Sequence, residues 1–460
     1  MYAEIFGGLV VTCALVRFAQ YYFSDASPAS DAAKPSDGPA ANTPDFRAFQ
    51  NNYLLVYLLA IAADWLQGPY VYALYAEYGY GKKEIAQLFI AGFGSSAVFG
   101  TFIGSIADKY GRKFNVLVFV ITYALSCMTK HSPNFATLMV GRLLAGIATS
   151  ILFSAFESWL VSEHNNRGFD PNLIADTFSK AQFGNAVVAI VAGQIAGIVA
   201  AQFGKVAPFD TAAVVLAATG LIVMLSWSEN FGDSRQTVTG GLRSAWHMMI
   251  ADEKILLVGI IQSCFESAMY LMVFSWTPAL QAASNAMSLG EIPHGMIFSS
   301  FMVCIMIGSS LFVFLMKTQP AELFMRNMYI IGVVCFVVTT ISSNVWEVYG
   351  ALLAFEVICG LYFPAMGTMR AKYVPEVTRS AIMNYFRLPL NLIVCLILYK
   401  NYENTTVFCL CAVMMAIAVI CQQRLFSASK VSIGTKDEWT REERAELVEE
   451  GDSTVEDAVR

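Results

Sequence analysis

Charged residues are scarce in this chain, and their scarcity excludes most kinds of soluble protein. Asp, Glu, Lys and Arg make up 14% of the 460 residues, against about 25% in average soluble domains. Hydrophobic residues reach 56% and the mean hydropathy is +0.55, which is high for a water-soluble chain of this length. The 13% aromatic content excludes disorder, collagen and a coiled coil. A protein with several membrane spans is the class that remains.

The sequence also lacks the motifs of nucleotide and metal chemistry. It has no P-loop, no HExxH motif and no zinc-finger spacing, and its four histidines form no metal constellation. The ten cysteines lie in apolar runs without the spacing of a disulfide framework, so we interpret them as reduced core residues. We therefore expect neither an enzyme nor a bound cofactor.

The net charge of −6 comes from one short segment. Residues 436–460 hold ten acids and four bases, so the rest of the chain is neutral overall. This balance gives no indication of a nucleic-acid partner. We interpret the acidic tail as a solvated end, and recruitment of a cytoplasmic partner is the alternative.

Apolar stretches long enough to cross a bilayer recur along the whole chain. A hydrocarbon core about 30 Å thick needs roughly 20 apolar residues in a helix. Six stretches lie on each side of a polar segment at residues 228–253. They span residues 53–78, 85–106, 114–128, 135–159, 175–201 and 211–227, and then 255–279, 295–316, 328–342, 345–369, 381–399 and 406–422.

A further apolar stretch, residues 2–23, precedes a linker rich in Ser, Pro and Ala. It lacks the basic start of a signal peptide, so we predict an uncleaved thirteenth helix. The predicted organisation is an N-terminal hydrophobic helix (1–23), a flexible linker (24–50), a six-helix bundle (51–228), a central cytoplasmic loop (229–253), a second six-helix bundle (254–423) and an acidic cytoplasmic tail (424–460).

Lysine and arginine are divided unevenly between the loops. One set of loops holds twelve and the other five, and the basic set is expected in the cytoplasm together with the tail. The sequon at Asn404 falls on the opposite side, in a loop so short that we predict it to be unused. With no retention signal visible, we predict a multi-pass protein of the plasma membrane.

The loop after the second stretch carries the most specific motif. Gly104-x-x-x-Asp108-Lys109-x-Gly111-Arg112-Lys113 matches the G-x-x-x-D-[RK]-x-G-R-[RK] loop of the major facilitator superfamily at every specified position. Glycines permit close helix contact and a tight turn, while Asp108 and Arg112 can pair with helix ends or with each other. The resemblance implies a conformational latch. We expect Glu157, at the cytoplasmic end of the fourth stretch, to pair with Arg112.

Ionisable residues inside the apolar stretches are costly and mark a cavity, a partner or a pathway. Asp64 and Glu266 lie at corresponding positions of the first and seventh stretches, near the midplane. The fourth and tenth stretches offer Arg142 and Glu356 at equivalent places. The fifth and eleventh offer two polar residues at the same spacing, namely Gln182 and Asn185, and Asn384 and Arg387. Such correspondence is typical of repeats around a midplane site, although structural ion pairs between helices are the alternative.

Longer strings of residues in several of the apolar stretches indicate one branch of this superfamily. They include Ala63-Asp64-Trp65-Leu66-Gln67-Gly68-Pro69-Tyr70, Phe153-Ser154-Ala155-Phe156-Glu157-Ser158-Trp159, Phe265-Glu266-Ser267, Trp276-Thr277-Pro278, Phe298-Ser299-Ser300-Phe301-Met302, Cys359-Gly360-Leu361-Tyr362-Phe363-Pro364 and Asn384-Tyr385-Phe386-Arg387. Together they resemble the eukaryotic molybdate-anion transporter branch of the major facilitator superfamily. The resemblance implies an all-α polytopic membrane protein with two six-helix bundles, here with an extra N-terminal hydrophobic helix.

The function implied by this resemblance is uptake of molybdate by alternating access. Arg142 and Arg387 would donate charge-assisted hydrogen bonds to the oxyanion, with Gln182, Asn185, Asn384 and Gln262 as neutral donors and Trp65 as a further cavity residue. Three carboxylates, Asp64, Glu266 and Glu356, outnumber the two arginines. A dianion would therefore load more easily if protons came with it, which predicts proton coupling. We expect a monomer in the lipid bilayer.

Two alternatives remain open from the residues alone. One is a carrier of another solute, such as an organic anion or a sugar, because one fold serves many substrates. The other is a membrane sensor or scaffold that does not transport.

Overall fold

The computed structural model describes residues 1–24, 43–170, 172–231, 246–375 and 379–429. Within those ranges, the side chains of residues 21–24, 101–108, 172, 175, 379–381 and 384 lie outside the description. The described residues form helices joined by turns and short loops, with no β-strand among them. The central loop and the acidic tail, residues 232–245 and 430–460, also lie outside the described part.

The helices follow the predicted spans closely. Eleven helices of the described residues are long and apolar enough to cross a membrane, and α4 and α15 occupy the second and eleventh predicted stretches. The bounds are α1 (Tyr2–Ser24), α2 (Pro44–Gln67), α3 (Val71–Glu77), α4 (Lys82–Tyr110), α5 (Arg112–Met128), α6 (Phe135–Leu152), α7 (Ala155–Asn166), α8 (Asn172–Phe203), α9 (Ala207–Ser226), α11 (Glu253–Ala286), α12 (His294–Thr318), α13 (Ala321–Ile341), α14 (Val345–Tyr373), α15 (Arg379–Lys400) and a last helix, Asn404–Ser429.

Short polar residues determine where several helices begin. Backbone N–H groups in the first turns of α6, α11 and α14 donate hydrogen bonds to the side chains of Asn134, Asp252 and Asn344, respectively. At α2, Thr43 caps the helix and Pro44 takes its first position. Both devices satisfy or remove N–H groups that have no partner within the helix. As a result α2 begins inside the predicted 24–50 linker, and residues 44–50 are helical.

Two predicted spans are broken rather than continuous. The first is interrupted by a 3-10 turn, Gly68–Tyr70, where Pro69 cannot donate a backbone hydrogen bond. The fourth, expected as one helix over 135–159, splits into α6 and α7 at Phe153 and Ser154, and neither residue is a helix breaker. By contrast, α11, α14 and α15 each contain an internal proline and continue through it.

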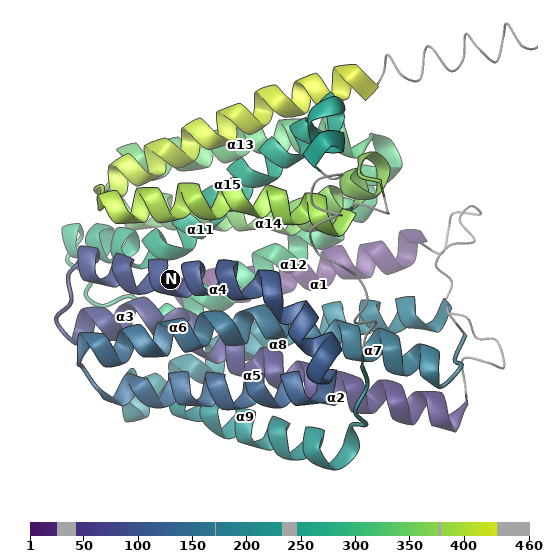
Figure 1. Cartoon of the computed structure of the whole chain (residues 1–460). Helices are drawn as coiled ribbons and strands as arrows, with labels where there is room; N and C mark the ends of the chain where they lie inside the picture. Colours follow the sequence, from purple (N-terminus) through teal and green to yellow (C-terminus); the bar gives the residue numbers. More distant parts are fainter. Residues whose placement is uncertain (25–42, 171, 232–245, 376–378, 430–460) are drawn as a thin grey trace, which may run out of the picture.

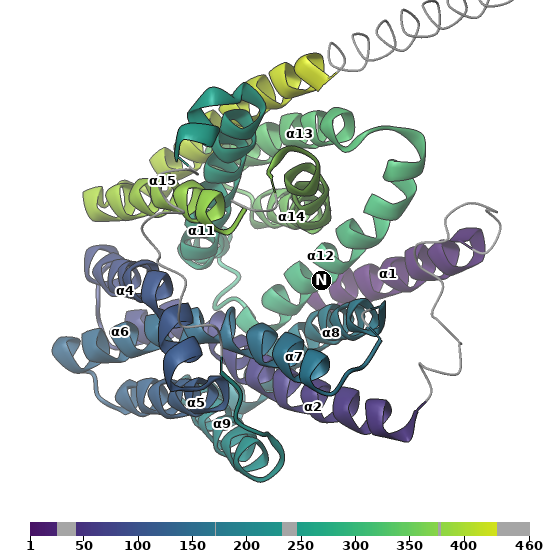
Figure 2. The same ribbon diagram turned by 45° about the vertical axis from the view of Figure 1, so that its right-hand side comes forward.

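The helices form two bundles that meet along two seams. Figure 1 shows α2–α9 grouped below and α11–α15 with the last helix grouped above. The bundles contact each other through α8 with α12 and through α4 with α15. Figure 2 shows α12 reaching down toward the first bundle. There Gly295 fits so tightly that a Cβ atom would lie 2.4 Å from the Gly193 carbonyl oxygen.

The extra helix α1 lies outside both bundles and packs against α12 (Figure 2). Its buried Cys13 joins Val303, Met306 and Ile307 of α12 in a small apolar cluster, to which Ile190 of α8 also contributes. The first helix therefore covers the α8–α12 seam between the bundles.

We name the two ends of the bundles from the predicted orientation. The outer end contains the turn between α8 and α9 and the loop between α11 and α12. The inner end contains α7 and the turn between α4 and α5.

Candidate functional site

Two carboxylates in the middle of the molecule are each bonded to a tyrosine of a neighbouring helix. Asp64 of α2 accepts a hydrogen bond from the Tyr123 hydroxyl of α5. Glu266 of α11 accepts one from the Tyr362 hydroxyl of α14, at 2.9 Å. Both carboxylates are half-buried. The two bundles thus repeat one arrangement, an acid held by a phenol, with tyrosines from non-equivalent helices.

The two arginines of the predicted site have no carboxylate partner. Arg142 donates from Nε to the Leu88 carbonyl at 3.3 Å, and its guanidinium lies 4.9 Å from the centre of the Phe89 ring. The side chain fits because Gly92 has no Cβ, which would lie 2.6 Å from an Arg142 nitrogen. Arg387 is exposed. Among the residues whose side chains are described, no carboxylate lies within 4.0 Å of either arginine.

The structural ion pairs considered as an alternative therefore do not form. Asp64 and Arg142 are near enough for their charges to interact, but the Asp64 carboxylate accepts a hydrogen bond from Tyr123 and Arg142 Nε donates to the α4 backbone instead. Arg387 lies in the electrostatic range of Glu266 without contacting it.

Glu356 differs from the other two acids because it is almost completely buried. Its exposed fraction is 4%, and its nearest titratable neighbours are two thiols, Cys304 of α12 and Cys359 one turn along α14. No cation among the described side chains lies within ion-pair distance of it. An ionised carboxylate in such surroundings would be costly.

The neutral residues of the predicted site differ in their surroundings. Trp65 donates from Nε1 to Asn185 Oδ1 at 2.7 Å, and its ring lies 5.7 Å from that of Phe298 in the opposite bundle. Gln182 is exposed, whereas Gln262 is buried and its Oε1 has no hydrogen-bond partner. The side chain of Asn384 lies outside the described residues. Trp65 and Asn185 are thus brought together beside the other bundle.

The latch motif is held by an acid that the sequence analysis missed. Gly111 has φ +107°, and a Cβ there would meet the Glu229 carboxylate at 2.4 Å. Glu229 accepts the backbone N–H groups of Lys113 and Phe114, at 2.8 and 3.0 Å. It therefore caps the N-terminus of α5, where a negative charge is favourable. Gly104 and Asp108 lie in α4, and their side-chain surroundings are outside the description.

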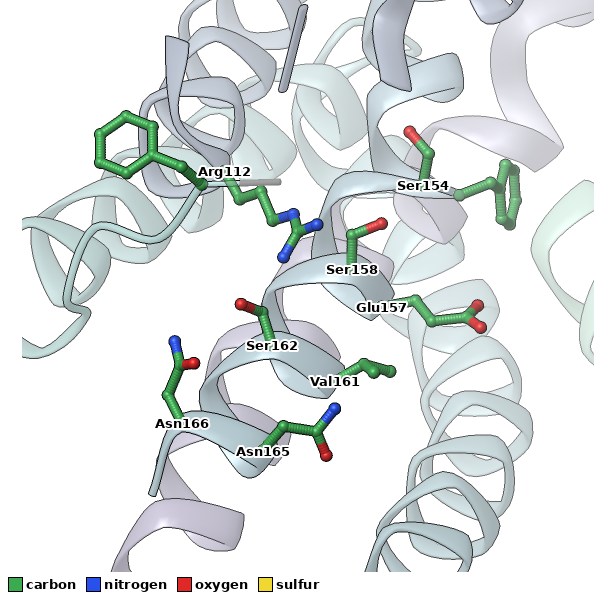
Figure 3. Close-up of a pocket in the computed structure, with 10 residues that line it drawn as sticks. Arg112, Ser154, Glu157, Ser158, Val161, Ser162, Asn165 and Asn166 are labelled. Carbon is green, nitrogen blue, oxygen red and sulfur yellow. The ribbon is translucent and has the colours of Figure 1, made fainter. Parts of the chain in front are cut away.

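The expected pair between Glu157 and Arg112 does not form. Figure 3 shows the Arg112 guanidinium turned toward Ser158, whereas the Glu157 carboxylate points away from it on the other side of α7. Both line a polar pocket of about 630 Å³ at the inner end, with Phe153, Ser154, Ser158, Val161, Ser162, Asn165, Asn166 and Phe231. The break between α6 and α7 displaces Glu157 from the straight-helix position on which the expectation relied.

Two further cations inside the apolar region were not singled out from the sequence. Lys130 is 1% exposed, its Nζ has no hydrogen-bond partner, and it lies 5.5 Å from the centre of the Tyr75 ring. Arg17 of α1 lies 4.8 Å from the Phe183 ring of α8. A scan of every apolar stretch for charges would have found Arg17, whereas Lys130 falls in the loop that follows the 114–128 stretch.

Comparison with known proteins places this arrangement in context. A family profile described as sugar transporters with twelve transmembrane segments matches residues 1–362. The molybdate-anion transporter of Xenopus tropicalis is 33% identical and covers 91% of this chain and 93% of its own length. Those of Xenopus laevis (35%; 86% and 90%) and Takifugu rubripes (33%; 89% and 94%) are similarly close.

Solved structures show the same fold at low sequence identity. A mutant of the nucleoside transporter NupG superimposes with a TM-score of 0.68 at 12% identity, over 82% of this chain and all of that chain. A bacterial homologue of the human lysosomal transporter Spinster, inward-facing and unoccupied, gives 0.63 at 12%, over 84% and 98%. These likenesses concern the arrangement of helices.

Proposed function

The chain belongs to the molybdate-anion transporter family of the major facilitator superfamily, and from that premise we propose that it carries molybdate across a membrane by alternating access. Its relatives of that name match about nine-tenths of the chain. The structural observation that supports an anionic substrate is the pair of arginines, one in each bundle, with no described carboxylate within 4.0 Å. Their charges are therefore available to a ligand.

In this proposal, Arg142 and Arg387 bind the tetrahedral dianion from opposite bundles. A guanidinium is always charged and presents several N–H donors, which suits an oxyanion. Gln182, Asn185, Asn384 and Gln262 supply neutral donors, and Trp65 forms part of the cavity wall. Rocking of the bundles about this site would expose it to each side in turn.

The acids supply the coupling in the same proposal. With Asp64, Glu266 and Glu356 ionised, the site would be one charge negative before a dianion arrived. Glu356 is buried with no described cation near it, which disfavours its ionised form, whereas the hydrogen bonds from Tyr123 and Tyr362 favour the ionised forms of Asp64 and Glu266. We therefore propose that one or two of these carboxylates bind protons as molybdate loads. Uptake that ignores external pH and a protonophore would contradict the coupling and leave the substrate assignment intact.

The inner-end motif takes the role of a latch. Gly104, Asp108, Gly111, Arg112 and Glu157 would govern opening at that end, with Glu229 fixing the start of α5. We further propose that the protein works as a monomer in the plasma membrane with the C-terminal tail in the cytoplasm.

A sugar is the second candidate substrate, because the matching family profile is described as one of sugar transporters. A tryptophan hydrogen-bonded to an amide, as at Trp65 and Asn185, is compatible with sugar binding too. Counterflow against a panel of sugars, organic anions and oxyanions separates the two. The sensor alternative predicts that truncating the tail abolishes signalling and leaves accumulation unchanged.

The decisive experiment is molybdenum accumulation, measured by elemental mass spectrometry in cells without their own molybdate uptake. We expect Arg142→Gln and Arg387→Gln each to lose at least tenfold in uptake at equal surface expression, because charged hydrogen bonds to the substrate are removed. Arg326→Gln is the matched control, since Arg326 bonds Gln423 at the inner end. A wild type that accumulates no more than empty vector would refute the molybdate assignment.

A further inference from the structure

A groove runs along the extra helix α1 where this helix crosses the seam between α8 and α12 (Figure 2). Its volume is about 520 Å³, and apart from Arg17 its lining is apolar. On α1 the lining extends from Val10 to Arg17, and on α8 from Phe183 to Val191. Each of these stretches covers about 10 to 12 Å of its helix. The groove therefore extends along the helix axes.

The groove lies on the surface that faces the bilayer. Both α1 and α8 are long and apolar enough to cross a membrane, and only 6% of the α1 span is buried within the protein. Phe183 is 50% exposed and Val191 is 49% exposed. Apolar side chains that remain exposed on a membrane span lie against the hydrocarbon chains of lipids. The groove is thus accessible to acyl chains.

Arg17 is the one charged residue among the described residues that line this groove. Its guanidinium lies 4.8 Å from the centre of the Phe183 ring, and its Nε atom is buried without a hydrogen-bond partner. Among the side chains that the structure describes, no carboxylate lies within 4.0 Å of it. A charged side chain inside a membrane span is costly unless it has a partner. The described part of the chain supplies no anion to Arg17.

The position of Arg17 along α1 is close to the membrane interface. Tyr21 and Tyr22 follow it by about one turn in the sequence, and tyrosines are enriched at that interface. Ser24, the last residue of α1, lies about 10 Å beyond Arg17 along the helix. Because a long arginine side chain can extend toward the headgroups, its guanidinium can reach a lipid phosphate. The other end of the groove, at Val10, lies deeper in the bilayer.

This combination matches an anionic phospholipid. The phosphate oxygens of a lipid headgroup accept the paired N–H donors of a guanidinium, and an acyl chain suits the apolar lining. Basic pockets between membrane helices at the cytoplasmic side are typical binding sites for anionic headgroups. A free phosphate ion would match the arginine alone and would leave the apolar groove unfilled.

We propose that the groove between α1 and α8 binds an anionic phospholipid of the inner leaflet. Arg17 binds the headgroup phosphate while the ring of Phe183 supports the guanidinium, and one acyl chain lies along the lining toward Val10. The groove also borders Val303 and Met306 of α12, so the bound lipid contacts both bundles. The proposal does not depend on which solute the protein carries.

The test is native mass spectrometry of the full-length protein purified in detergent. Phosphatidylglycerol and phosphatidylcholine with the same acyl chains are titrated separately, and the dissociation constants of the first bound lipid are compared. Arg17→Gln and Arg17→Lys test the charge, and Ala14→Phe fills the groove, which Ala14 lines. Inorganic phosphate is added as a competitor.

Two control variants match these changes. Arg167 also lies at the inner end over an aromatic ring, 5.1 Å from the centre of the Phe49 ring, but it pairs with Glu163 at 2.8 Å. Arg167→Gln therefore removes a guanidinium whose charge already has a partner. Leu15→Phe adds bulk beside Ala14 at a position that is exposed and does not line the groove.

The wild type should bind phosphatidylglycerol about fivefold or more tightly than phosphatidylcholine, because the choline headgroup carries its own cation. Arg17→Gln should bring the two affinities within twofold of each other, whereas Arg17→Lys should keep most of the preference because the charge remains. Ala14→Phe should weaken binding of both lipids about tenfold. Both controls should bind like the wild type, and inorganic phosphate should not displace the lipid.

Three results would overturn the proposal. A wild type without a preference for phosphatidylglycerol, or a preference that persists in Arg17→Gln, would show that Arg17 does not recognise the headgroup. Displacement by inorganic phosphate would assign Arg17 to a free anion. Equal binding by Ala14→Phe and Leu15→Phe would place the acyl chain outside the groove. None of these results involves molybdate, so the transport proposal is tested separately.

Discussion

The outer and inner ends of the molecule differ in how the bundles touch. At the outer end, Lys205 of the first bundle pairs with Glu291 of the second at 2.7 Å. Lys82 of α4 donates to the Tyr402 carbonyl and to Asn404, at 2.6 and 2.7 Å. The close contact of Gly193 with Gly295 lies near the same end.

At the inner end, no hydrogen bond or ion pair between two described side chains joins the bundles. The 630 Å³ polar pocket at that end is lined by residues of the first bundle alone. The outer end is thus joined by polar contacts at partly exposed positions, each of which is weak on its own. An alternating-access protein needs closures of this kind, because contacts that are individually weak can be broken in each cycle.

Of the substitutions that test this difference between the two ends, Gly295→Ala should have the largest effect. A new Cβ would lie 2.4 Å from a backbone oxygen that cannot rotate away, and overpacking of this kind costs about 1 to 3 kcal/mol. We expect the outer end to stay open and uptake to fall about tenfold at equal surface expression. Gly350→Ala is the control, since a Cβ there would meet nothing within 4 Å. Equal uptake in the two variants would show that the closed outer end is not needed.

A smaller effect is expected from Lys205→Gln. This change removes the pairs with Glu291 at 2.7 Å and Glu77 at 3.5 Å, and exposed pairs contribute about 0 to 1 kcal/mol each. The outward-open population should rise, so the external half-saturation for molybdate should fall two- to fivefold. Lys83→Gln serves as control, because Lys83 is exposed and has no side-chain partner among the described residues. An unchanged value would mean that the ion pairs do not bias the two states.

The smallest effect should depend on pH. The hydrogen bond and charge of Lys205 lower the pKa of Glu291 below its ordinary 4.5. Burial tends to lower the pKa of Lys205, but the bond and charge of Glu291 outweigh it and raise the pKa above 10.5. The ion pair between Lys205 and Glu291 therefore stabilises the closed outer end fully at any pH between the two pKa values. This stabilisation is lost as pH falls through the lowered Glu291 pKa.

Glu291→Gln isolates this contribution from any proton coupling. The external half-saturation of wild type and variant should differ by a constant factor from about pH 5.5 to 8, and converge below about pH 4. A difference that varies within the neutral range would assign the pH response to another group.

Sequence patterns predicted the spans well because a run of about twenty apolar residues matches the thickness of the hydrocarbon core of a bilayer. Asp64 and Glu266 could be singled out too, because a carboxylate is conspicuous in an apolar run. They could not predict what those charges contact. Tyr123 and Tyr362 look like ordinary membrane tyrosines, and Glu229 lies 116 residues from Lys113, whose backbone it caps.

The break at Phe153 and Ser154 shows a second limit. No proline or glycine marks it, so the fourth span reads as one helix, and the expected Glu157 partner followed from that reading. Tertiary packing, with Phe156 and Trp159 buried and Phe153 exposed, decided the local geometry instead.

The extra helix α1 places the two described ends of the chain on opposite faces of the molecule. Tyr2 packs against Trp346, at the outer start of α14, with ring centroids 4.8 Å apart, whereas the last helix ends at the inner end with Ser429. The first and last described residues therefore lie on opposite faces. A label attached at Met1 and one attached after Ser429 would report from different compartments, so a pair of such labels reads out the orientation of every molecule in intact cells.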